Sequence, residues 1–142
     1  MARKMTIPSV SIDGDTRVTI TWHWPTPDDN KALPVHGNTN RWARQAIVKR
    51  WKTAARDLCL EAEVPNWEQA TVSYWFYRPN RRTIDQMNHA QRMKSVIDGA
   101  VLAGLLPDDN DRHLQVDGMR SEIDKDNPRI EIEFVRDKWD IQ

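Results

Sequence analysis

Carboxylate side chains are the groups in this sequence best able to do chemistry. Asp85 follows an arginine-rich turn at the expected start of a helix, and Asp108 and Asp109 follow the expected end of that helix. Carboxylates gathered in one place repel one another and require a hard cation, usually Mg²⁺ or Mn²⁺. Such a site can activate water for attack on a phosphodiester. From spacing alone, an N-cap at Asp85 and a simple turn at 107–110 are the better interpretation.

Lys94 and Asp98 lie four residues apart on the same expected helix. They can form a surface ion pair worth about 0.3–0.5 kcal/mol, or Lys94 can sit beside a bound phosphate. The helix separates its own ends by roughly 25 Å. Asp109 can therefore approach Asp85 only if the loop after Gly104 folds back, or a second subunit must complete the site.

Other chemical motifs are weak. The four histidines show no metal-ligand spacing, and the Asp-Lys-Asp-Asn string at 124–127 is typical of a turn. The sequence holds no phosphate-binding glycine loop. The tryptophans mostly occur at strand or helix period, which favours core positions over base-stacking positions.

Composition excludes several classes of protein. The 142 residues suit one domain, spanning residues 1–142, and 21 basic residues balance 21 acidic ones, so the chain is not a histone-like polycation. The single cysteine, Cys59, allows no internal disulfide. Neither a membrane-length apolar run nor an apolar signal core is present, which predicts a soluble cytosolic protein.

The charge is unevenly distributed along the chain. Residues 36–94 carry 11 basic against 5 acidic side chains, net +6, and residues 95–142 carry 6 against 12, net −6. This asymmetry is compatible with a polyanion-binding surface beside a carboxylate cluster, or with two solvated faces that pair with each other. Charge alone favours the second interpretation.

The elements that would position these residues follow from periodicity. We expect a flexible N-terminus over 1–16, a half-buried strand from Val18 to Trp24 and a long loop over 25–40. A helix over 41–62 follows, with N-cap candidates at 38–40. Its basic arc comprises Arg41, Arg44, Lys49, Lys52 and Arg56.

The second half predicts a central strand over 70–77, one helix over 85–102 that stops at Gly104, and a strand beginning at Leu114. A last strand over 129–136 is expected to pair with it as a hairpin through the loop 124–128. The order β-α-β-α-β-β predicts an α/β (α+β) domain, with two main helices packed on a mixed sheet.

Several of these motifs together resemble the RusA family of Holliday junction resolvases, most closely the versions from actinobacterial phages. The similarity spans about residues 38–136. It rests on the string Arg81-Arg82-Thr83-Ile84-Asp85-Gln86-Met87-Asn88, on Lys94, Asp98-Gly99, Ala103-Gly104 and Pro107-Asp108-Asp109, and on Asn40-Arg41-Trp42 with Trp51-Lys52 upstream.

The resemblance implies a small homodimeric, RusA-like endodeoxyribonuclease that resolves four-way junctions by paired nicks during DNA recombination and repair. It implies Mg²⁺, with Mn²⁺ as a substitute, and neither an organic cofactor nor a membrane partner. The enzyme would act in the cytoplasm, which is that of the bacterial host if the protein is phage-encoded.

The resemblance also assigns residues. Asp85, Asp109 and Lys94 would be catalytic, and Asp85, Asp98, Asp108 and Asp109 would hold the metal. The basic arc, together with Arg78, Arg81 and Arg82, would follow the DNA backbone.

One position departs from the family pattern Asp-x-Asp-Asn. Met87 replaces the second aspartate, and a thioether is a poor ligand for a hard cation. Asn88 or Asp98 could complete the metal shell instead. Two other classes stay open: a branched-DNA-binding protein without cleavage, and a phage protein-interaction module that would expose an apolar patch.

Overall fold

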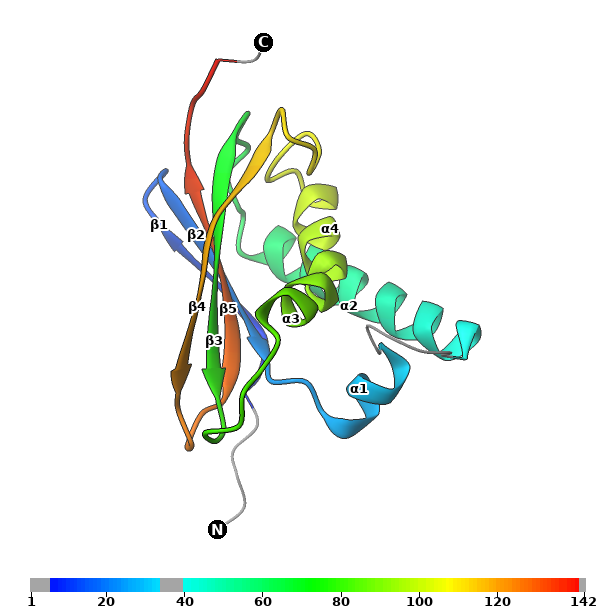
Figure 1. Ribbon diagram of the computed structural model, residues 1–142. Coiled ribbons are helices and arrows are strands. Elements are labelled where there is room, and N and C mark those ends of the chain that lie inside the picture. The colour runs from blue at the N-terminus through cyan, green and yellow to red at the C-terminus, as the bar shows by residue number, and fades with distance from the viewer. Residues whose placement is uncertain (1–5, 34–39, 141–142) are drawn as a thin grey trace.

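The computed structural model describes residues 6–33 and 40–140, in which five strands form one mixed sheet in the order β1-β2-β5-β3-β4. All the helices drawn in Figure 1 lie on one face of this sheet. The elements are β1 (Ser9–Asp13), β2 (Arg17–His23), α1 (Pro27–Ala32), α2 (Arg41–Glu61), β3 (Ala70–Arg78), α3 (Gln86–Arg92), α4 (Lys94–Leu102), β4 (Leu114–Ile123) and β5 (Arg129–Arg136). The expected mixed α/β architecture is therefore confirmed.

Period-two patterning builds the core side of the sheet. In β2 and β5 every second side chain is buried, so Ile20 lies opposite Ile132 and Trp22 opposite Ile130 under the helices. The central strand β3 follows the same alternation, with Phe76 fully buried. Burying these branched and aromatic side chains is the main favourable term that holds the sheet to the helices.

The prediction that the last two strands pair as a hairpin is wrong. β4 pairs in parallel with β3, and β5 pairs antiparallel with the other side of β3, so β3 lies between them. The connection 124–128 crosses the end of β3, where the Asp124 amide donates to the Arg78 carbonyl at 2.8 Å. Two strand spacings are about 10 Å, which five residues span easily. The length of this loop therefore could not show whether β4 and β5 are adjacent in the sheet or are separated by another strand.

Two elements were missing from the expected order. The segment interpreted as a flexible N-terminus contains β1, which pairs antiparallel with β2. The expected loop over 25–40 contains α1, which begins with a capping box between Thr26 and Asp29. Of the N-cap candidates for α2, Asn40 is confirmed, since its side chain accepts from the Trp42 and Ala43 amides. Residues 38 and 39 lie outside the described residues.

The single helix expected over 85–102 is two helices. α3 ends at Arg92 and α4 begins at Lys94, with the fully buried Met93 between them at ψ −2°. That value departs from the helical −42° and changes the helix direction. Figure 1 shows α4 crossing α2 while α3 runs at an angle to it.

Helix α2 packs on the sheet through only part of its length. Its buried side chains are Trp51, Ala55 and Cys59, whereas residues 41–46 are all exposed. The N-terminal turns of α2 project beyond the sheet in Figure 1. Among the described residues, no helix combines the length and apolar character needed to cross a bilayer.

Candidate functional site

Lys94 at the start of α4 joins two carboxylates. Its ammonium group lies 3.0 Å from Asp98 Oδ1, which confirms the expected ion pair, and it also contacts Asp109 Oδ2. The Lys94 side chain remains 59% exposed, against 33% for Asp98 and 23% for Asp109. A lysine shared in this way is accessible to solvent and held in place from two sides.

The loop after α4 brings Asp109 back to the start of that helix. Gly104 adopts φ +96°, a conformation that favours glycine, and its amide bonds to the Val101 carbonyl. The Leu105 amide bonds to the Ala100 carbonyl, which completes a Schellman motif. Leu105 and Leu106 are then buried and anchor the returning chain. The expected stop at Gly104 is confirmed, and the loop after it folds back to Lys94 but not to Asp85.

Asp85 lies apart from this cluster. It is the N-cap of α3, and its Oδ1 accepts from the Asn88 amide at 3.3 Å. Lys94 is nine positions further along the chain, beyond the whole of α3, and nine helical positions span up to about 13 Å. Asp108 accepts from the Asp109 amide at 2.7 Å and from the Asn110 side chain at 3.1 Å. Asp85 therefore caps a helix and Asp108 bonds within its own turn, which are the local roles that their spacing also allowed.

The carboxylates in this arrangement do not fit a magnesium site. Asp98 and Asp109 point at an ammonium group, while Asp85 and Asp108 bind backbone amides. Within residues 6–33 and 40–140, no three carboxylate, imidazole or thiol side chains are grouped as metal ligands would be. Met87 is 64% exposed and contributes only its thioether.

The cluster borders a groove of about 1040 Å³ between α2 and the α3–α4 pair. Its floor is apolar and includes Val48, Tyr74 and Met119. Its polar lining is mostly cationic or amide-bearing: Arg41, Arg44, Gln45, Lys49, Lys52, Gln91, Arg92, Lys94, Ser95 and Asp98. The other apolar side chains of the lining are Leu33, Met87, Ala90, Ile97 and Val116.

The cations that α2 contributes to this groove differ from those elsewhere on the surface. In the described part of the chain, Arg41, Arg44, Lys49 and Lys52 have no carboxylate within ion-pair distance. A row of cations facing one concave surface attracts a polyanion such as a phosphate backbone.

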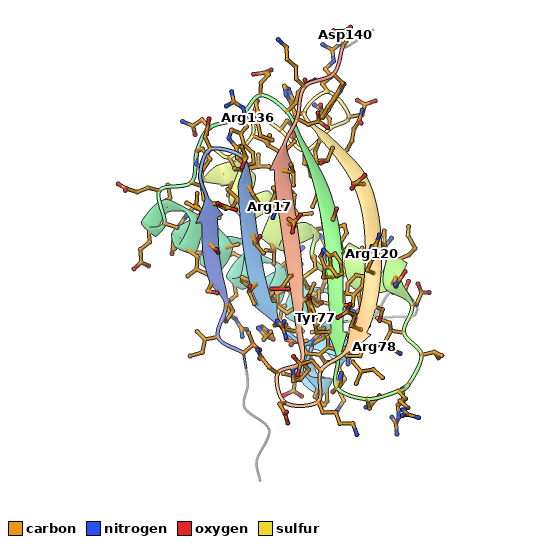
Figure 2. All side chains as sticks on the ribbon, turned by 90° about the vertical axis from the view of Figure 1, so that its left-hand side faces the viewer. Arg17, Tyr77, Arg78, Arg120, Arg136 and Asp140 are labelled. Carbon is orange, nitrogen blue, oxygen red and sulfur yellow. The ribbon has the colours of Figure 1, made fainter. Side chains whose placement is uncertain are left out.

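On the outer face of the sheet, by contrast, charges and aromatic rings pair with one another. Arg17 lies 3.7 Å from Glu133, and the Arg129 guanidinium lies 3.8 Å from the centre of the Tyr77 ring. Figure 2 shows this face, with Arg17, Tyr77 and Arg120 on it. Charged side chains on this face therefore have partners, which the α2 cations that line the groove lack among the described residues.

The other predicted DNA-binding cations do not line the groove. Arg56 pairs with Asp57 at 2.9 Å, and Arg78 lies at the end of β3, where it donates to the Arg82 carbonyl at 2.9 Å (Figure 2). Arg81 and Arg82 are exposed in the turn that follows. The structure thus brings together one part of the predicted basic set and leaves the other part on the β3–α3 turn.

Sequence reasoning missed two polar residues of the groove. Arg92 donates through Nε to the Leu33 carbonyl at 3.1 Å, and burial lowers its pKa. The Ser95 hydroxyl is buried and has no hydrogen-bond partner among the described residues. Ser95 lies four residues after Gln91, a helical spacing that could have indicated its place on this face, whereas no spacing singled out Arg92.

His89, one of the four histidines without metal-ligand spacing, packs against two aromatic rings. Its ring packs 4.9 Å from the Trp24 ring and 5.8 Å from the Phe76 ring, measured between centroids. Burial, with a smaller effect of the nearby Arg92 charge, lowers its pKa to about 4. The neutral imidazole is therefore part of the core beside the groove.

Comparisons with known proteins place no family on this chain. No family model and no curated protein matches it. Among solved structures, the chain is similar to the OmpA-like domain of FopA1 from Francisella tularensis subsp. tularensis SCHU S4. That match has a TM-score of 0.39 and 14% identity over 100% of this chain and 87% of that chain. A similarity at this level carries no argument about fold or function.

Proposed function

We propose that this protein binds branched DNA in the groove between α2 and α3–α4 and nicks it, as a RusA-like crossover junction endodeoxyribonuclease acting in DNA recombination and repair. The observation that carries the proposal is the position of the Lys94–Asp98–Asp109 cluster at the border of a groove lined by unpaired cations. A phosphate backbone following α2 would pass beside Lys94 and Asp109, two of the three residues that the resemblance marks as catalytic.

The cluster suits contact with a phosphodiester. Lys94 is exposed and shared, so a phosphate can take one of its three N–H donors without leaving either carboxylate in an apolar environment. An ammonium group at this place would offset the negative charge that builds up on a phosphate under attack. The Lys49 and Lys52 side chains would hold the neighbouring phosphates in register.

The proposal keeps three further expectations from the resemblance: Mg²⁺ as the metal to test, a homodimer, and action in the bacterial cytoplasm. Two symmetry-related nicks in a four-way junction suit a two-fold dimer. Magnesium binding at Asp98 and Asp109 would require both carboxylates to turn away from Lys94.

A branched-DNA-binding protein without cleavage is the second candidate. It is favoured by Met87, which lines the groove at the position of a family aspartate, and by the scattered carboxylates. Both candidates use the same groove, so cleavage alone distinguishes them.

The deciding experiment uses purified protein, an end-labelled four-way junction and a linear duplex of matched sequence. Each is incubated with Mg²⁺, Mn²⁺ or EDTA, with the Asp109→Asn variant in parallel. Paired nicks that require metal and disappear in the variant would establish the nuclease. Tight junction binding without nicks would establish the second candidate. A protein that neither binds nor cuts DNA would contradict both and favour an interaction module.

A further inference from the structure

Trp42 is the exception among the seven tryptophans. Trp22, Trp51 and Trp67 are buried as expected, and Trp24, Trp75 and Trp139 are partly buried. Trp42, by contrast, is 76% exposed. An indole in water costs free energy, because its large apolar surface is left hydrated. The expectation that the tryptophans are core residues is therefore wrong at this position.

The place of Trp42 is the projecting end of α2. It is the second residue of the helix, and all side chains from Arg41 to Ala46 are exposed. Its backbone is nevertheless fixed, since its amide donates to the Asn40 side chain at 3.0 Å. The ring is thus presented to solvent from a rigid element.

The same helix places the ring at the border of the basic groove. Residues seven apart on a helix differ by about 20° in direction, so Trp42 points almost the same way as Lys49. Lys49 lines the groove, as do Arg41 and Arg44 on either side of Trp42 in the sequence. An aromatic ring among backbone-binding cations is the arrangement by which proteins hold unstacked bases.

We propose that Trp42 stacks on a base at the branch point and so gives the protein its preference for branched over continuous DNA. This inference rests on the proposed function of the groove. In a continuous duplex both faces of each internal base pair are covered by neighbours. In an open junction the pairs next to the branch point have one uncovered face, on which an indole can stack.

The test compares wild type, Trp42→Ala and Trp42→Phe for binding to a four-way junction and to the matched duplex without metal. The matched control is Leu60→Ala, because Leu60 is 54% exposed on the opposite end of the same helix. We expect Trp42→Ala to lose about tenfold or more in junction affinity while duplex affinity changes less than twofold. Trp42→Phe should retain most of the preference, and Leu60→Ala all of it.

A second readout reports stacking directly. With 2-aminopurine next to the branch point, wild type and Trp42→Phe should quench its fluorescence on binding, and Trp42→Ala should not. Equal losses on junction and duplex, no loss on either, or a changed sedimentation coefficient for Trp42→Ala would overturn the inference. Wild type that binds neither DNA would instead overturn the proposed function, and this inference with it.

Discussion

Lys94 holds the candidate site together, because its ammonium group is the one cation between Asp98 and Asp109 among the residues that the structure describes. Without it, the negatively charged carboxylates of Asp98 and Asp109 would face each other with no cation between them. Its exposure means that water and salt screen these contacts, so the pair energies stay small. Its importance is therefore expected in activity more than in folding.

Replacing Lys94 by methionine tests this division. We expect the free energy of unfolding to fall by about 0.5–1 kcal/mol at low salt, and by less in 0.5 M NaCl, because the lysine is exposed and both carboxylates are reached by solvent. Lys94→Arg should keep the stability, since it keeps the charge. Urea unfolding at the two salt concentrations gives the measurement, and nicking by Lys94→Met at the wild-type rate would contradict its assigned role.

His89 should make stability depend on pH. Its pKa is lowered to about 4 in the fold, from 6.5 in the unfolded chain. Between these values the unfolded chain binds a proton that the folded chain excludes, so stability falls as pH drops from about 6.5 to 4. Partial exposure of the ring reduces the effect to about 1–2 kcal/mol.

The His89→Phe variant should flatten this pH dependence, because phenylalanine keeps the contact with the Trp24 and Phe76 rings but cannot be protonated. Melting temperatures between pH 4 and 7 provide the comparison. A variant that loses stability on acidification as steeply as wild type would place the responsible proton elsewhere.

At the scale of elements, the contact between α2 and α4 sets the relative position of two helices that line the groove. The helices approach closely at Gly99, where an added Cβ would lie 2.4 Å from the Lys52 carbonyl oxygen and 2.7 Å from the Ala55 Cβ. Lys52 lines the groove, so this contact also fixes one of the proposed phosphate-binding side chains.

Substituting alanine at Gly99 should therefore push the helices apart. We expect a loss of about 2–3 kcal/mol in the free energy of unfolding, because backbone atoms of α2 would have to move. Gly118→Ala is the matched control, since a Cβ there meets nothing within 4 Å. Chemical denaturation followed by circular dichroism measures both, and equal effects of the two substitutions would refute the close-packing explanation.

For the whole molecule, net neutrality conceals a division of charge between faces. The cations of α2 face the groove without partners among the described residues, whereas those of the outer sheet face are paired. Binding of a nucleic acid should accordingly depend on a small number of ion contacts and on salt.

The double variant Lys49→Ala/Lys52→Ala should reduce the salt dependence of DNA binding. Each lost phosphate contact lowers the slope of log K against log salt by about 1, so a decrease of about 2 is expected. Arg81→Ala/Arg82→Ala, outside the groove, is the control and should leave the slope unchanged. If the control lowers the slope and the groove variant does not, the DNA follows the β3–α3 turn instead. Sedimentation velocity on the same samples reports whether the protein is a dimer.

Local features of this protein were determined by the sequence alone, because they depend on residues close together in the chain. Alternation of apolar residues marked β2, β3 and β5, the N-cap at Asp85 began a helix, and Gly104 ended one. The Lys94–Asp98 pair followed from helical spacing.

Only the tertiary structure decided which distant segments meet. The loop 124–128 has turn composition, but packing of the α3–α4 crossover placed β4 on the far side of β3 and gave β5 the inner position. Asp109 contacts Lys94 because Leu105 and Leu106 are buried in the core and hold the loop close to α4. Trp42 is exposed because the first turns of α2 project away from the sheet (Figure 1). Each outcome depends on the shape of surfaces built from the whole chain, and no pattern within one segment encodes that shape.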